Sequence, residues 1–561
     1  MFAKVAFAAL LVLASVPASA TPAAPIRTAR TPPESAPSAL PSTRLPTIVA
    51  VYPNPVAMDD VGEFVVVSFP NETNLSGWTL SDDESTARLP ARTVSGRVAF
   101  STAPNRTESL TPLRTLSLSN LSLANSGETI TLRRETTVEI DESGEATEWN
   151  STRGRVDSVR YVDAPEGEYW RPKAEEWRPL GATNFSISRS GATSARVFVL
   201  PDDPEVPVET LRNANRRILL AGYSFTSRRI ADLLVAAKNR GVNVHVVVDD
   251  APVGGISNRE ATVLDGLTRN GVTVEVIGGE RGRYDFHHAK YAIADDEAVV
   301  MTENWKPAGV GGHASRGWGV VVGGDAATDL REVFVADTSW NDTVSWADFR
   351  RGRTFNPVTP ANESYPTRFP AKRVSVDSVD VLTAPDNAES GVLSLLRSAN
   401  DSISVQQMTA GGIDQPFVRA TLAAARRGVE VRILLGSAWY VSEDNRRVVD
   451  WLNERADAEG LPLQAKLARP DGYEKIHAKG VVVDERHVVV GSLNWNNHSA
   501  RENREVAVVL HGDAAGAYYT RVFGADWGTN ENTFPVGLAG FVAIGVAGAI
   551  WIAKREIRFE R

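Results

Sequence analysis

The stretch that decides the fold is KIHAKGVVVDERHVVVGSLNW, which runs from Lys475 to Trp495. A related stretch, FHHAKYAIADDEAVVMTENW, occupies residues 286–305. In each stretch a His and a Lys stand two positions apart, so in an extended strand their side chains share one face. The short apolar runs that follow predict buried β-strands, and their repetition predicts two copies of one structural unit.

The segments around the two stretches alternate between strand-like and helix-like patterns. An amphipathic segment, SRRIADLLVAAKNRG (227–241), separates two Val- and Leu-rich runs, and ATLAAARRGVEVRILLG (420–436) has the same helix-then-strand order. Such alternation is typical of layered α/β proteins. We therefore predict two repeated α/β units, repeat 1 over residues 196–348 and repeat 2 over residues 374–530. A linker over 349–373 joins them, and together they form one pseudo-twofold domain.

The residues before repeat 1 have a different pattern. Residues 21–45 are rich in Pro, Ser, Thr and Ala, which is typical of a linker. Residues 46–190 contain short alternating runs between turns, such as EFVVVSF (63–69) and ETITLRRE (128–135), and predict an all-β immunoglobulin-like sandwich. This segment also resembles a lamin-tail-like domain. The elements that carry this resemblance are YPNP, GEFVVV, LSGWTLSD, LANSGETITL and VDSVRYVD.

Both ends of the chain contain apolar segments. Residues 1–20 combine Lys4, an apolar stretch and a small-residue end at Ala20, which predicts a secretory signal peptide. Residues 534–553 carry no charge and are long enough for a transmembrane helix, and the basic start of residues 554–561 fits the positive-inside rule. We therefore expect a single-pass protein of the cell membrane. Its tail would be cytoplasmic, and the bulk of the chain would be extracytoplasmic after removal of the signal peptide.

Composition limits the possible chemistry. The 561 residues include no cysteine, which excludes disulfides, thiolate nucleophiles and cysteine-based zinc sites. The formal net charge is −9. Residues 196–348 contain 16 Lys and Arg against 22 Asp and Glu, and residues 374–530 contain 16 against 21. This acidic balance disfavours a broad surface for a nucleic-acid backbone. The spacing of His, Asp and Glu suggests no catalytic metal.

The polar residues of the two stretches have matching spacing. Repeat 2 contains H-x-K-x4-D-x6-G-S-x-N, and repeat 1 contains a variant of it. The matching residues are His477, Lys479, Asp484, Ser492 and Asn494 in repeat 2, and His288, Lys290, Asp295, Thr302 and Asn304 in repeat 1. A lysine and an asparagine amide can hold the nonbridging oxygens of a phosphodiester, and an imidazole can attack phosphorus or move a proton. We therefore expect the two histidines to flank one phosphorus atom.

This pair of motifs resembles the hallmark of the phospholipase D superfamily, and the resemblance covers residues 196–530. It implies a two-step, metal-independent reaction without a cofactor. One histidine becomes a phosphohistidine while the other protonates the leaving alcohol and then activates water or a second alcohol. The motif aspartates, Asp295 and Asp484, have a structural role in this family. The residues expected to bind the phosphate besides the lysines are Thr302, Asn304, Ser492 and Asn494.

Glu505 follows the second motif, where the family has a carboxylate that hydrogen-bonds a catalytic histidine. In some relatives this carboxylate reaches the histidine of the opposite repeat. On that pattern Glu505 orients His288, which makes His288 the nucleophile and His477 the general acid. We assign the corresponding position of repeat 1 to Gly319, so we expect this repeat to lack the carboxylate. We expect Glu303, inside the first motif, to point outward, because an acid beside the site would repel a phosphate.

The expected function is that of a membrane-anchored, extracytoplasmic phosphodiesterase that hydrolyses phospholipid headgroups through a phosphohistidine. Three alternatives stay open. They are an extracellular nuclease of the same superfamily, a phosphatidyltransferase, and a non-catalytic binding or adhesion protein with a decayed catalytic unit. The two retained His-Lys pairs argue against the decayed unit. A monomer would contain a complete site, so the site implies no particular oligomeric state.

Overall fold

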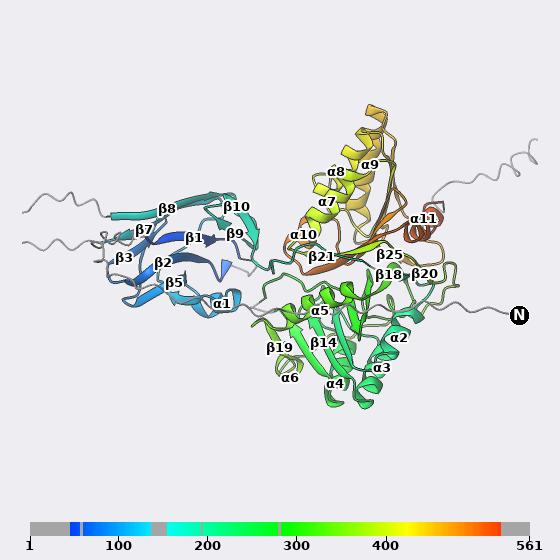
Figure 1. Cartoon of the computed structure of the whole chain (residues 1–561), viewed down its shortest axis with the longest axis horizontal. Helices are drawn as coiled ribbons and strands as arrows, with labels where there is room; N and C mark the ends of the chain where they lie inside the picture. Colours follow the sequence, from blue (N-terminus) through cyan, green and yellow to red (C-terminus); the bar gives the residue numbers. More distant parts are fainter. Residues whose placement is uncertain are drawn as a thin grey trace, which may run out of the picture. The chain divides into compact units, whose positions relative to one another are not determined.

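The structure is a computed structural model, and it describes residues 45–55, 60–82, 84–135, 154–191, 194–278 and 282–528 (Figure 1). Within these residues the chain forms an N-terminal β-rich part, followed by two large sheets with helices packed against them. The change from one architecture to the other occurs just before residue 195. This is where the alternating sequence pattern gives way to the α/β pattern.

Two sheets of the N-terminal part enclose a common core. A six-stranded sheet has the order β10-β9-β1-β2-β5-β6, and a four-stranded sheet has the order β4-β3-β7-β8. The bounds are β1 Thr47–Tyr52, β2 Phe64–Asn74, β3 Trp78–Ser81, β4 Thr86–Arg88, β5 Thr93–Ser101, α1 Pro104–Leu110, β6 Arg114–Ser117, β7 Gly127–Arg134, β8 Gly154–Val162, β9 Glu168–Arg171 and β10 Glu176–Pro179. Val67 and Phe69 of the larger sheet share a buried cluster with Leu80 and Leu132 of the smaller one. The structure therefore shows the expected all-β sandwich, and its lamin-tail-like type stays a prediction.

Each repeat contributes one sheet, and the seven central strands have the same order in both. The order is β12-β18-β17-β16-β13-β14-β15 in repeat 1 and β21-β28-β27-β26-β22-β23-β24 in repeat 2. The strands of repeat 1 are β12 Ala195–Leu200, β13 Arg217–Gly222, β14 Asn243–Asp249, β15 Thr273–Ile277, β16 Tyr291–Ala294, β17 Glu297–Met301 and β18 Ser315–Gly323. Those of repeat 2 are β21 Ser378–Ala384, β22 Ser402–Gln407, β23 Glu430–Leu435, β24 Leu463–Leu467, β26 Lys479–Val483, β27 His487–Gly491 and β28 Glu505–His511. Shorter strands are β11 Ser188–Ser190, β19 Thr343–Ser345, β20 Lys372–Val374 and β25 Lys475–Ile476. The shared order shows the internal repeat in three dimensions.

Helices pack on both faces of each sheet (Figure 1). Their bounds are α2 Glu205–Arg212, α3 Arg228–Asn239, α4 Asn258–Arg269, α5 Asp325–Thr338, α6 Trp346–Phe349, α7 Ala388–Ser398, α8 Pro416–Arg426, α9 Ser442–Glu459, α10 Asn497–Arg501 and α11 Asp513–Gly528. Successive residues of a strand point to opposite faces of the sheet. In β14, Val246 joins the cluster of Leu234 from α3, whereas Val247 joins the cluster of Val333 from α5. This double burial explains why the central strands are almost entirely apolar.

One core is common to both repeats. The cluster that contains Val247 and Val300 of repeat 1 also contains Val488 and Val508 of repeat 2, together with Tyr519 from α11. Fully burying a Val side chain stabilises a fold by roughly 1.5–3 kcal/mol, so a shared cluster of this kind holds the two repeats together as one domain. The inner faces of the two sheets are thereby fixed against each other, and the H-x-K segments end beside this core.

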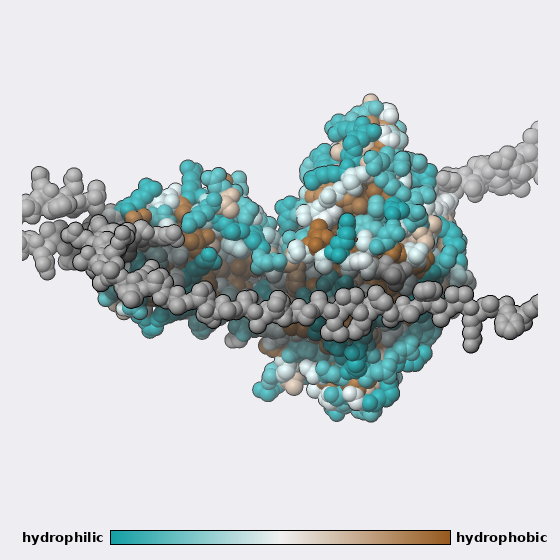
Figure 2. All heavy atoms as spheres, in the orientation of Figure 1, coloured by the Kyte–Doolittle hydropathy of each residue, from teal (hydrophilic) through white to brown (hydrophobic). Residues whose placement is uncertain are grey.

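The view of the surface in Figure 2 agrees with this distribution of apolar residues. On the face shown, hydrophilic residues predominate among the coloured atoms, and hydrophobic residues form separate small areas. Most of the large apolar side chains are accounted for by the buried clusters of the sandwich and the two repeats. A few large hydrophobic side chains are strongly exposed, among them Val253 and Trp439.

The expected single-pass architecture is corrected by the structure. No helix in the described ranges, which end at residue 528, is both long and apolar enough to span a membrane. The structure therefore does not support the C-terminal transmembrane helix of the predicted fold class, nor the localisation to the cell membrane that rested on it. The predicted helix over 534–553 and tail over 554–561 lie outside the described residues, as do the predicted signal peptide over 1–20 and most of the linker over 21–45. The basis for the helix was the hydropathy of the segment together with the basic residues that follow it.

Candidate active site

The two H-x-K segments lie where the repeats meet, and each segment pairs with a strand end of the other repeat. The N–H of His288 donates to the carbonyl of Arg504 at 2.9 Å, and the N–H of His477 donates to the carbonyl of Arg316 at 3.0 Å. A parallel bridge joins His287 to Arg504, and β25 pairs in parallel with β18. Each motif histidine is therefore held against the strand that the other repeat contributes.

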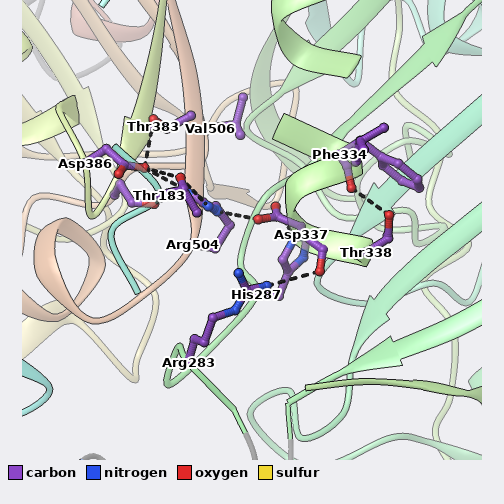
Figure 3. A network of polar contacts seen from close by, with 12 residues as sticks. Thr183, Arg283, His287, Phe334, Asp337, Thr338, Thr383, Asp386, Arg504 and Val506 are labelled. Carbon is purple, nitrogen blue, oxygen red and sulfur yellow. Dashed lines mark hydrogen bonds and ion pairs between the residues drawn. The ribbon is translucent and has the colours of Figure 1, made fainter. Parts of the chain in front are cut away.

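A buried ionic network anchors the repeat 2 strand at this crossing (Figure 3). Arg504 Nε lies 2.9 Å from Asp337 Oδ1, and Arg504 Nη1 lies 3.0 Å from Asp386 Oδ2. His287 Nε2 lies 3.1 Å from the other oxygen of Asp337. Burial alone would raise the pKa of Asp337, but Arg504 and His287 hold it below its usual value. The network therefore fixes the residues next to His288 and Glu505.

Repeat 1 has the matching network at the second crossing. Arg316 is fully buried, forms an ion pair with Asp202, and places Nε 3.0 Å from Asp526 Oδ2. Asp526 also accepts a 2.8 Å hydrogen bond from Gln406 Nε2. Removing one partner of such a buried pair leaves an uncompensated buried charge and strongly destabilises the folded protein. The two arginines are thus equivalent anchors of the pseudo-twofold arrangement.

The residues that follow these arginines, Gly317 and Glu505, occupy equivalent positions. Strand pairing gives the same register, because Gly319 in β18 and Ala507 in β28 pair with the corresponding last residues of β17 and β27. Assigning the carboxylate position of repeat 1 to Gly319 is therefore wrong by two residues. The correct position is Gly317, which also lacks a carboxylate.

Glu505 binds the histidine of the opposite repeat, as the sequence predicts. Its two carboxylate oxygens lie 2.9 and 3.0 Å from His288 Nδ1, and Asn503 Nδ2 donates to it at 3.2 Å. Burial would raise the pKa of Glu505, but His288 and Lys290 outweigh burial and hold it below its usual value. A charged carboxylate on Nδ1 keeps the proton on that nitrogen, so Nε2 is the atom left for chemistry.

Glu303 lies beside the second histidine, and the expectation that it points outward is wrong. Its residue is only 2% exposed, and Oε2 lies 3.3 Å from His477 Nδ1. The pair is in ion-pair range, although its geometry is looser than that between Glu505 and His288. Both histidines therefore have a carboxylate from the opposite repeat. Two features of the sequence could have indicated the inward position of Glu303. They are the presence of an acid inside the motif and the glycine at position 317.

The two lysines of the motifs belong to the same charged cluster. Lys290 and Lys479 donate to the carbonyls of His288 and His477, in the latter case at 2.8 Å. Burial lowers the pKa of Lys290 well below its usual value, and it lowers that of Lys479 to about 8. Each lysine interacts electrostatically with carboxylates from both repeats. The six groups thus form a single site across the junction.

Both imidazoles are largely enclosed and favour the neutral form. The side chains of His288 and His477 are 12% and 14% exposed. Burial lowers the pKa of His288 to about 3 even though Glu505 opposes this effect, and burial also lowers the pKa of His477. The nearby lysines act in the same direction as burial. A neutral imidazole is the form that can attack phosphorus.

The remaining motif residues fall into two groups. The side-chain carbonyl oxygens of Asn304 and Asn494 are buried and have no hydrogen-bond partner among the described residues. The hydroxyls of Thr302 and Ser492 are buried and instead bond to backbone of the next strand, at 3.0 Å from Trp318 N and from Val506 N respectively. These contacts join neighbouring strands. The assignment of all four residues to phosphate binding stays a prediction.

Asp295 and Asp484 bind main chain at the ends of their hairpins. Asp295 accepts hydrogen bonds of 2.8 to 2.9 Å from the N–H groups of Asn215, Arg216 and Arg217. Asp484 accepts from three successive N–H groups in the same way, at residues 400–402. The hydrogen bonds hold the pKa of both aspartates below the usual value although burial opposes them. Each aspartate joins its hairpin to the start of the neighbouring antiparallel strand, β13 for Asp295 and β22 for Asp484, in keeping with the structural role expected for it.

Across the described part of the chain, no group of three or more His, Asp and Glu side chains is placed to hold a metal ion. The groups at the junction are two imidazoles, two amines and two carboxylates, each pair related by the pseudo-twofold. Such a site can bind one phosphorus between two nitrogen atoms and place amines beside its oxygens.

Comparison with known proteins supports this description. Residues 208–326 and 392–527 match the family model described as cardiolipin synthase, PLD-like domain. A cardiolipin synthase of Oceanobacillus iheyensis is 26% identical over 335 residues, which cover 54% of this chain and 62% of that protein. The chain thus spans less than two thirds of the length of this relative.

Similar solved structures include the phosphatidylserine synthase of Haemophilus influenzae, with 14% identity and a TM-score of 0.45 over 58% of this chain and 84% of that one. Nuc, a phospholipase D family member from Salmonella typhimurium, has 24% identity and a TM-score of 0.23 over 27% of this chain and 93% of that one. The family match includes both H-x-K segments and most of both sheets, and the chain therefore belongs to the phospholipase D superfamily.

Proposed function

We propose that this protein transfers the phosphatidyl group of a phospholipid through a phosphohistidine, without a metal ion. The observation that carries the proposal is the reciprocal arrangement of the two histidines. Glu505 of repeat 2 binds Nδ1 of His288, and Glu303 of repeat 1 lies beside Nδ1 of His477. Each imidazole thus presents Nε2, with an adjacent lysine, to the junction between the repeats.

In the first step, His288 Nε2 attacks phosphorus and the bond from phosphorus to the leaving alcohol breaks. The proton on His477 Nε2 passes to the leaving oxygen. In the second step, His477 takes a proton from the acceptor, whose oxygen attacks phosphorus, and the phosphorus–nitrogen bond to His288 breaks. His288 is assigned as nucleophile because its contact with Glu505 is the shorter and better aligned of the two.

The charges of the site fit a diester anion. Burial lowers the pKa of Lys290 and of both histidines, so the unliganded site resists holding all its positive charge. A bound phosphodiester adds a negative charge beside these groups and favours their protonated forms. Substrate binding would therefore protonate His477, which is the state that a general acid requires.

Two features favour a phospholipid over a nucleic acid. The family model and the Oceanobacillus relative carry the name of a lipid-synthesising enzyme. In addition, the equivalent loops after β14 and β23 expose large apolar side chains, Val253 at 82% and Trp439 at 88%. The N–H of Val253 bonds to the hydroxyl of Tyr223, whose ring centroid lies 4.6 Å from that of His288. Apolar tips close to the site suit a lipid interface.

The acceptor distinguishes transfer from hydrolysis. Water as acceptor gives the hydrolysis expected from the sequence, whereas a second alcohol gives transfer, and the names of the relatives favour the alcohol. Both reactions share the phosphohistidine and need the same two histidines. The distinction therefore concerns which hydroxyl reaches His477 in the second step.

The test uses the full chain, EDTA and vesicles of phosphatidylglycerol, with single-stranded and duplex DNA as competing substrates. We expect a product with two phosphatidyl groups and release of glycerol. Phosphatidic acid as the sole product would identify a hydrolase, and cleavage of DNA alone would identify a nuclease. Absence of activity on lipids, DNA and bis(p-nitrophenyl) phosphate would favour a binding protein and contradict the proposal.

A further inference from the structure

We propose that Glu303 is the positioning carboxylate of His477, and that Gly317 is the residue that gives it room. The inference deepens the function proposed above, since it assigns the second histidine a partner at a position outside the usual pattern of the motif. Glu303 lies between Thr302 and Asn304, where repeat 2 has Leu493 between Ser492 and Asn494. The carboxylate of repeat 1 therefore comes from a different position than that of repeat 2, but it approaches the same atom, Nδ1 of the opposite histidine.

Each repeat has two neighbouring positions that could carry the carboxylate, one in the motif and one on the strand that follows, and the two repeats use different ones. Repeat 2 has Leu493 in the motif and Glu505 on the strand, and repeat 1 has Glu303 in the motif and Gly317 on the strand. Leu493 is buried in the apolar core of repeat 2. Each repeat therefore has one carboxylate and one residue that does not obstruct it. In repeat 1 Gly317 leaves space for Glu303, and in repeat 2 Leu493 packs into the core, away from Glu505.

The volume around Glu303 supports this exchange. A Cβ atom on Gly317 would lie 2.7 Å from Glu303 Oε1 and closer still to its Cγ. A Cβ atom on Gly309 would lie 2.6 Å from Oε2. Neither distance is possible for real atoms in contact, so both positions require glycine while Glu303 points to the junction. The side chain of Glu303 fills the space that a strand residue at position 317 would otherwise use.

The chemical role follows from the atom that Glu303 approaches. It lies beside Nδ1 of His477, the same nitrogen that Glu505 holds on His288. A carboxylate there selects the tautomer with Nε2 free and strengthens the base. The other charged groups that face His477 are Lys479 and Lys290, and both act against its protonation. Glu303 is the group that opposes them.

The first experiment replaces Glu303 with glutamine, which keeps the volume and removes the charge. We expect kcat on bis(p-nitrophenyl) phosphate to fall at least about tenfold with little change in KM, because the substrate contacts stay intact. The limb of the pH profile that reports His477 should move to lower pH. Glu303→Gln with unchanged kcat and pH profile in a folded protein would overturn the inference.

The second experiment moves the carboxylate to the strand. The variant Glu303→Leu with Gly317→Glu copies the arrangement of repeat 2, and its matched control is Glu303→Leu with Gly317→Ala. We expect the transplanted variant to recover at least about tenfold in kcat over the control. Equal kcat in the two variants, with both folded, would contradict a positioning role for a carboxylate at this place.

A third readout does not depend on activity. In protein labelled at histidine with 13C and 15N, the NMR titration of His477 should show a lower pKa in Glu303→Gln than in the wild type, and Nδ1 should lose its preference for the proton. If the wild type has no activity on any phosphodiester, this titration still tests the pairing of Glu303 with His477. An unchanged tautomer and pKa would overturn the inference whatever the activity.

Discussion

The two repeats each supply a carboxylate to the histidine of the other repeat, but from different positions. Repeat 2 supplies a carboxylate from the start of β28, at Glu505, and repeat 1 supplies one from the loop after β17, at Glu303. Each carboxylate approaches Nδ1 of the histidine in the opposite repeat. The comparison teaches that the pseudo-twofold symmetry holds for the groups of the site, since each histidine has a carboxylate at Nδ1. It does not hold for the sequence positions that supply these carboxylates.

The repeats also differ in how firmly they hold their histidines. His288 receives both oxygens of Glu505 at 2.9 and 3.0 Å, and Tyr223 packs edge-on against its ring. His477 has a single 3.3 Å approach from Glu303. A nucleophile benefits from a fixed orientation, while a general acid and base must respond to two different oxygens. The difference therefore suits the assignment of His288 as nucleophile.

The largest expected effect concerns the two histidines themselves. His288→Asn and His477→Asn should each reduce turnover of a phospholipid by at least about 10⁴-fold, because neither step proceeds without both groups. The measurement is the steady-state rate on phosphatidylglycerol vesicles in EDTA. His313→Ala is the control and should keep the wild-type rate, since His313 binds only the carbonyl of Glu363 among the described contacts. A substantial rate in either asparagine variant would remove the central pair from the mechanism.

The next effect concerns the buried arginines. Arg504→Met should lower the free energy of unfolding by about 3–5 kcal/mol, because Asp337 and Asp386 are left buried without their partner. Urea unfolding measures the change. The control is Arg189→Ala, whose side chain is 65% exposed beside Asp380 and should matter by no more than about 1 kcal/mol. Equal effects of the two substitutions would show that the crossing is not anchored by the network.

A smaller effect on kcat is expected when either carboxylate is neutralised, and its size should differ between the two. Glu505→Gln should lower kcat by about 100-fold and by more than Glu303→Gln does, because Glu505 makes the closer and better aligned contact with its histidine. Parallel kinetics of the two variants on bis(p-nitrophenyl) phosphate compare them directly. The reverse order would mean that His477, and not His288, depends more on its partner, and would reverse the proposed roles.

The smallest effect is a dependence of stability on pH. The folded protein holds the pKa of His288 at about 3, and the unfolded chain has the usual value of 6.5. Between these values the unfolded chain binds more protons, so the stability contributed above pH 6.5 is lost as pH falls towards 3. In His288→Gln, urea unfolding between pH 7 and pH 4.5 should show a shallower loss than in the wild type. An identical slope would show that the pKa of His288 is the same in the folded and the unfolded state.

Much of this arrangement could be predicted from the sequence. Repeated spacing was enough to match His288 with His477, because the strand period fixes which side chains share a face. The assignment of Glu505 to His288 came from the resemblance to the phospholipase D superfamily, and the structure places the two side chains in contact. The repeat boundaries followed from the change in hydrophobic period. These features are local in sequence, and the fold only brings them together.

The rest depended on contacts that no local pattern contains. Glu303 was expected to point outward because an acid beside the site would repel a phosphate. Its inward position depends on the glycine at 317 on the next strand, which leaves room for the side chain. The position equivalent to Glu505 was placed two residues too late, at Gly319, because the sequence alone does not show that the buried Arg316 and Arg504 are equivalent. The C-terminal helix rested on hydropathy and on the basic residues that follow the segment, and no membrane-spanning helix occurs in the described residues.

The most direct test of the central claim is to trap the intermediate. In His477→Asn, bis(p-nitrophenyl) phosphate needs no acid for its good leaving group, so His288 should release one equivalent of p-nitrophenol and then stop. Mass spectrometry of the quenched protein should find the nitrophenyl phosphate on His288. Modification of a different residue, or continued turnover without any phosphohistidine, would contradict a site in which two histidines from opposite repeats act on one phosphorus.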